Sequence, residues 1–131
     1  MTIANWCVLI AALLPFVCTI TAKSVGVGKS RRNGGYDNND PRGWLSRQTG
    51  LSQRANSAQA NSFEALPFFI GAVALAQQGG ADQGHIDQLA MAFIGLRVVY
   101  IGLYFANLAT LRSVVWFAAI VANVMILLAL R

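Results

Sequence analysis

The sequence predicts an all-α integral membrane protein whose four helices run up-down-up-down and form one bundle. Composition is the first reason: 56% of the 131 residues are hydrophobic and 11% are charged, whereas soluble domains carry about 25% charged residues. Charge segregation is the second reason, because seven of the ten Lys and Arg residues lie from Lys23 to Arg54. One wet, basic loop therefore interrupts an apolar chain. The length fits a single domain, 1–131.

Four stretches are long enough to cross a bilayer, which takes about 20 mostly apolar residues. The predicted spans are 2–22, 55–77, 87–108 and 111–130. The first has no charged residue, and the last two contain one each, Arg97 and Arg112. The second opens with polar residues and contains Glu64, so we expect its polar half to face other helices. The first span follows no Lys or Arg, which favours a retained helix over a cleaved signal peptide.

The loop 23–54 carries seven basic residues against only Asp37 and Asp40. The positive-inside rule therefore predicts that this loop is cytoplasmic and that both termini lie on the other side. The turn-forming Asn33-Gly34-Gly35 leaves two alternatives, a mobile loop or one folded over the cytoplasmic mouth of the bundle. We expect its basic residues to meet anionic lipid headgroups and not nucleic acid. The compact chain favours a bacterial inner membrane.

Several other kinds of site are excluded by the sequence. One His and no paired Cys-x-x-Cys give no metal-ligand spacing, so no metal is expected. The Gly28-Lys29-Ser30 string lacks the earlier glycine and the preceding strand of a phosphate-binding loop. Cys7 and Cys18 fall about 16 Å apart on one predicted helix, too far for a disulfide.

Polar residues inside the predicted spans are candidates for a site, because they are unfavourable in a bilayer unless they have partners. Asn61 and Glu64 are three residues apart and share one helix face. Glu64 and Arg97 each lie ten residues from the predicted cytoplasmic end of their span, or about 15 Å deep. Because these two spans run antiparallel, we expect Glu64 and Arg97 to form an ion pair.

More polar residues lie between this pair and the cytoplasm. Tyr100 and Tyr104 follow Arg97 at spacings of three and four, which again defines one helix face. Arg112 and Ser113 begin the fourth span on the same side of the membrane. These groups predict a polar pocket that opens toward the cytoplasm.

The residues of the second, third and fourth spans resemble a known family. The string Asn61-x-x-Glu64-x-x-Pro67-Phe68, preceded by Arg54, closely resembles the second-helix signature of the MAPEG family, the membrane-associated proteins in eicosanoid and glutathione metabolism. The run Arg97-x-x-Tyr100-x-x-x-Tyr104 is similar to its third-helix signature, and Arg112-Ser113 is similar to the start of its fourth helix. The resemblance extends over all four predicted spans in order.

This resemblance implies a homotrimer of four-helix subunits that bind glutathione between subunits near the cytoplasmic side. It implies transferase, peroxidase or isomerase activity on lipophilic small molecules. On this basis glutathione would be held by Asn61, Glu64, Tyr100 and Tyr104, with Arg54 and Arg97 supporting them. Arg112 would stabilise the reactive thiolate, and Ser113 would donate a hydrogen bond to it.

The chain also departs from the family pattern. Ser57 stands where the eukaryotic enzymes carry an Arg, and Lys23 is the only cation near the end of the first span. Arg112 lies one position out of simple register with the thiol-activating Arg of some members. Two other functions therefore stay open. One is a non-catalytic bundle that binds lipid or a partner, and the other is a small proton-coupled exporter that uses Glu64.

Overall fold

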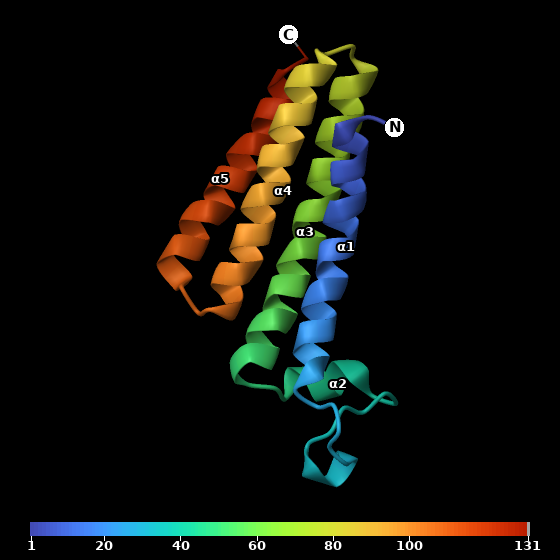
Figure 1. Cartoon of the computed structure of the whole chain (residues 1–131), viewed down its shortest axis with the longest axis vertical. Helices are drawn as coiled ribbons and strands as arrows, with labels where there is room; N and C mark the ends of the chain where they lie inside the picture. Colours follow the sequence, from blue (N-terminus) through green and yellow to red (C-terminus); the bar gives the residue numbers. More distant parts are fainter. Residues whose placement is uncertain (131) are drawn as a thin grey trace.

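The computed structural model describes residues 1–130, and all regular secondary structure in that range is helical. The long helices are α1 (Ile3–Ser24), α3 (Gly50–Gln78), α4 (Gln83–Phe105) and α5 (Ala109–Leu128). A short 3-10 turn, Arg31–Asn33, and α2, Pro41–Ser46, lie in the loop after α1. Figure 1 shows the four long helices side by side, with the N-terminus and the α3–α4 turn at one end and α2 at the other.

Three helices, α1, α4 and α5, are long and apolar enough to cross a membrane. Large apolar side chains on them are exposed, among them Phe16, Val98 and Phe117. Water would disfavour such a surface, and lipid would not. Helix α3 falls outside this group, so its membrane crossing stays a prediction.

Small residues allow the helices to approach closely. Ala4, Cys7 and Ala11 of α1 pack in one core with Ala72 and Ala76 of α3. Packing of small side chains is a main source of helix association in membranes. The aromatic rings of α3 and α4 meet in the same core, where Phe69 and Phe93 stack with centroids 4.1 Å apart. Both cysteines are buried, and they are free, as their spacing along one helix predicted.

A polar network joins the helix ends near the N-terminus. Asp87 of α4 accepts a hydrogen bond of 2.8 Å from the backbone N–H of Ala4 and another of 2.8 Å from the Gln83 side chain. Gln77 of α3 donates to Thr2 at 2.9 Å and to Gln83 at 3.2 Å. The first N–H groups of a helix have no partner within the helix. The network satisfies one of them and ties α1 to α3 and α4.

The helix bounds differ from the predicted spans at both α3 and α4. Helix α3 begins at Gly50, five residues before predicted position 55. The prediction followed apolar residues, and the first turns of α3 carry mostly polar side chains. Helix α4 begins at Gln83, since the Asp82 side chain accepts the His85 N–H at 2.8 Å as an N-cap. It ends at Phe105 instead of 108, because Asn107 adopts a left-handed φ of 60°.

The basic loop, for which the sequence left two alternatives open, is folded around Trp44. Trp44 is 4% exposed, and its indole N–H donates to the Gly34 carbonyl at 3.3 Å. Its ring meets Tyr36 edge to face at 5.3 Å, and Lys23 lies 4.7 Å from the Tyr36 ring. Gly26 permits this packing, because a Cβ there would lie 2.7 Å from the Trp44 ring. Trp44 is therefore the centre of a small aromatic core within the loop.

Candidate functional site

A continuous row of cations and aromatic rings runs along α4 to the start of α5. The Arg97 guanidinium lies 4.4 Å from the centre of the Tyr100 ring. Tyr100 and Tyr104 meet edge to face at 5.6 Å, and the Arg112 guanidinium lies 4.1 Å from the Tyr104 ring. Cations are attracted to the electron-rich faces of aromatic rings. The spacing of three and four therefore produces the shared face that the sequence predicted.

Arg97 is buried, with 3% of its surface exposed, and it is not paired with Glu64. Its Nη2 donates to the Ser62 hydroxyl at 3.2 Å. Over residues 1–130 the two ion pairs are both in the basic loop, Arg31–Asp37 and Arg47–Asp40. The predicted Glu64–Arg97 ion pair is thus wrong for the single chain. Equal depth brings both residues to one level, but the Tyr100 ring and Ser62 hold the guanidinium while Glu64 is exposed.

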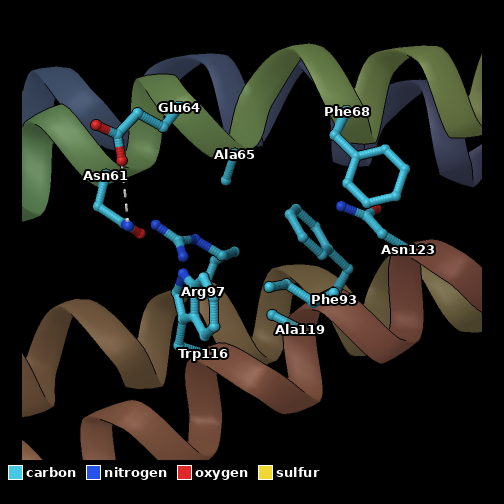
Figure 2. A pocket seen from close by; sticks show the side chains of 10 residues that line it. Asn61, Glu64, Ala65, Phe68, Phe93, Arg97, Trp116, Ala119 and Asn123 are labelled. Carbon is cyan, nitrogen blue, oxygen red and sulfur yellow. Dashed lines mark hydrogen bonds between the residues drawn. The ribbon is translucent and has the colours of Figure 1, made fainter.

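A cavity of about 170 Å³ lies between α3, α4 and α5. Asn61, Glu64 and Arg97 gather at one end of it, and Asn123 of α5 lies at the other (Figure 2). The Asn61 amide donates a long hydrogen bond of 3.5 Å to the Glu64 carboxylate. The structure therefore brings three of the predicted site residues to one cavity. Apolar walls, including the Phe93 side chain, separate its two polar ends.

The other predicted site residues lie elsewhere. Arg54 donates from Nε to the Phe105 carbonyl at 3.2 Å, which satisfies an end carbonyl of α4. The Ser113 hydroxyl donates to the Ala109 carbonyl one turn earlier at 3.1 Å, and its side chain is exposed. Tyr100 and Tyr104 belong to the aromatic row and not to the cavity lining.

Sequence reasoning missed three residues of the site. Ser62 binds Arg97, and Trp116 and Asn123 line the cavity from α5. Asn123 offered a usable signal, because an amide in the middle of an apolar span is a candidate for the same reason as Asn61. Trp116 offered none, since aromatic residues are common at many positions of membrane helices.

The apolar helices and the polar residues gathered between them define a helical, multi-pass membrane protein with an internal polar site. Within that class, the sequence model of the MAPEG family matches residues 3–131, nearly the whole chain. The protein belongs to the MAPEG family, which confirms the resemblance. No curated protein and no solved structure matches the chain.

Proposed function

We propose that this protein is a glutathione-dependent transferase or peroxidase that acts on lipophilic electrophiles. The observation that carries this proposal is the gathering of Asn61, Glu64 and Arg97 around one cavity. These residues occupy positions that match the family pattern, and their chemistry suits a zwitterionic peptide. The Glu64 carboxylate accepts from an ammonium group, and Asn61 has both a donor and an acceptor.

Arg97 supports the proposal because it has no carboxylate partner within the chain. A buried guanidinium without a carboxylate is unfavourable, and charge-assisted bonds to a carboxylate are among the strongest available to it. Its contacts in the chain are a hydroxyl and an aromatic ring, both neutral. A glutathione carboxylate supplies the missing negative charge.

The thiol lies near Arg112 in this proposal. Positive charge beside a thiol favours its thiolate, which is the reactive form. When bound, glutathione supplies a thiolate whose sulfur forms a bond to the electrophilic carbon while the leaving group departs with its electron pair. Arg112 is held in place by the Tyr104 ring, and Ser113 donates a hydrogen bond to the sulfur after releasing the Ala109 carbonyl.

Assembly as a homotrimer of four-helix bundles belongs to the same proposal. Helix α3 is less apolar than its neighbours. Its Glu64 side chain is exposed in the single chain. A carboxylate in contact with lipid is strongly disfavoured. A second copy of the chain against this face of α3 removes that contact. The basic loop is cytoplasmic, in a bacterial inner membrane.

Calorimetry on the detergent-purified protein tests glutathione binding. We expect a micromolar to low-millimolar dissociation constant for the wild type and loss of binding in Glu64→Gln. The matched control is Asp82→Asn, which also removes one negative charge but keeps a good helix cap at the other end of the molecule. Absence of heat at millimolar glutathione would overturn the transferase proposal and favour the non-catalytic bundle.

One observation favours a second function, the proton-coupled exporter. Such a protein needs a membrane-embedded carboxylate that can take up a proton, and pairing with Arg97 would oppose this. The structure holds Glu64 without that pair. Proton-driven efflux from vesicles that is lost in Glu64→Gln, together with no binding of glutathione, would support the exporter.

A further inference from the structure

Two buried side-chain oxygens in residues 1–130 have no hydrogen-bond partner, and both belong to the same cavity. They are the Oδ1 atoms of Asn61 and Asn123. Buried polar atoms in folded proteins nearly always have partners, so each exception calls for an explanation. Asn61 lies beside Glu64 and Arg97 and belongs to the site already described. Asn123 lies at the opposite end and has no role there (Figure 2).

Asn123 is buried within the protein and lies far along α5 from its first turn. It is 2% exposed, and it lies eleven residues after Arg112, which is about 16 Å along α5. Water is scarce at such depth, so an unsatisfied amide oxygen is especially unfavourable there. Figure 2 shows the Asn123 amide beside the rings of Phe68 and Phe93. These apolar neighbours offer its oxygen no hydrogen-bond donor.

We propose that this end of the cavity binds a compact lipophilic molecule, one aromatic ring in size, that donates a hydroxyl or N–H hydrogen bond to Asn123 Oδ1. The whole cavity, counting both of its ends, measures about 170 Å³. An apolar cavity of about 150 Å³ binds benzene, so this cavity holds no more than one ring. Phe68 and Phe93 supply aromatic walls at this end, whereas Trp116 lies beside Arg97 at the other end (Figure 2). A simple phenol has all the required features.

A trapped water is a poorer occupant than such a molecule. A buried water typically makes about three hydrogen bonds. At this end it would find the Asn123 amide among Phe68, Phe93, Ala119 and Ile120. A phenol makes the one hydrogen bond that is available and fills the remaining volume with apolar contact. The proposal goes beyond glutathione chemistry, because none of these contacts requires glutathione.

The test compares two probes of nearly equal shape, para-fluorophenol and para-fluorotoluene, by fluorine NMR with the protein in lipid nanodiscs. They differ in one hydrogen-bond donor. After correction for partition into the lipid, wild-type protein should bind the phenol more tightly. In Asn123→Leu the dissociation constant of the phenol should rise by about tenfold, which is the loss of one buried hydrogen bond. Binding of the toluene should change by less than about twofold.

Ala119→Leu is the second variant, because it fills the cavity and leaves Asn123 intact. It should abolish specific binding of both probes. Equal corrected affinity of wild type for the two probes would overturn the proposal, even if Asn123→Leu failed to fold. So would unchanged phenol binding in a folded Asn123→Leu protein. Glutathione calorimetry on Asn123→Leu keeps the two proposals separate, since loss of the phenol site should leave glutathione binding intact.

Discussion

Arg97 is a buried cation held by an aromatic ring and a hydroxyl in place of a carboxylate. Its planar guanidinium can lie against the Tyr100 ring and still donate to Ser62. A lysine ammonium at this position keeps the charge but has neither the planar shape nor the same reach. The chemistry of this residue therefore depends on shape as well as on charge.

Replacement of Arg97 by Lys should lower the free energy of unfolding by about 2 kcal/mol, since a desolvated cation–ring contact contributes about that much. Ser62→Ala, which removes only the hydrogen bond, should lower it by about 1 kcal/mol. Denaturation in mixed micelles, followed by circular dichroism, measures both values. A neutral Arg97→Lys would show that the planar shape of the guanidinium contributes nothing to stability beyond its charge.

Arg112 is less buried than Arg97 and Tyr100 in the aromatic row, so its removal should affect chemistry more than assembly. If the transferase proposal holds, Arg112→Ala should lower kcat by about 100-fold, the usual effect of losing one group that stabilises developing negative charge. The measurement is conjugation of glutathione to a chloronitrobenzene. Arg42→Ala, an exposed loop arginine, is the control. Full activity in Arg112→Ala would remove this residue from the mechanism.

At the scale of elements, most helices follow from the length of the apolar stretches, and their ends follow from single residues. The face shared by Arg97, Tyr100 and Tyr104 was predictable because helical spacing fixes which side chains are neighbours. The position of Glu64 away from Arg97 was not predictable, because depth along two helices does not specify their rotation toward each other. Helix α2 also had a signal that was overlooked, since Asp40 caps it and Pro41 begins it.

The folded state of the basic loop depends on Trp44, which contacts Tyr36 and Gly34. Trp44→Ala should expose the loop and accelerate trypsin cleavage after its basic residues several-fold, because local opening controls proteolysis. Gel electrophoresis of timed digests gives the rates. Trp6→Ala is the matched control, since that ring is half exposed on α1. Equal cleavage rates for the two variants would mean that the aromatic core does not hold the loop.

At the scale of the whole molecule, the open question in the membrane arrangement is helix α3. Its neighbours have the composition of membrane spans, and it packs against α1, α4 and α5. A membrane-spanning helix that is apolar can be recognised from its composition alone. A helix that packs against three others needs no such composition, so α3 can cross the membrane with fewer apolar residues than its neighbours.

Cysteine labelling in intact cells decides whether α3 crosses. Ser30→Cys and Gln78→Cys place exposed thiols before and after it, while the native Cys7 and Cys18 are buried. An impermeant maleimide should label Gln78→Cys in intact cells and Ser30→Cys only after the membrane is opened, as the positive-inside rule predicts. Labelling of both sites under the same condition would show that α3 does not cross.

The hydrogen bonds at the N-terminal end of α1 have a consequence for synthesis. The backbone of Ala4 and the side chain of Thr2 are bound by Asp87, on α4, and by Gln77, at the end of α3. Most of the chain must leave the ribosome before Asp87 exists. The first helix is therefore made before the Ala4 N–H has its Asp87 partner, although Thr2 already caps the Asn5 N–H. Any machinery that delays release of α1 into lipid until α4 arrives would protect this end from premature pairing.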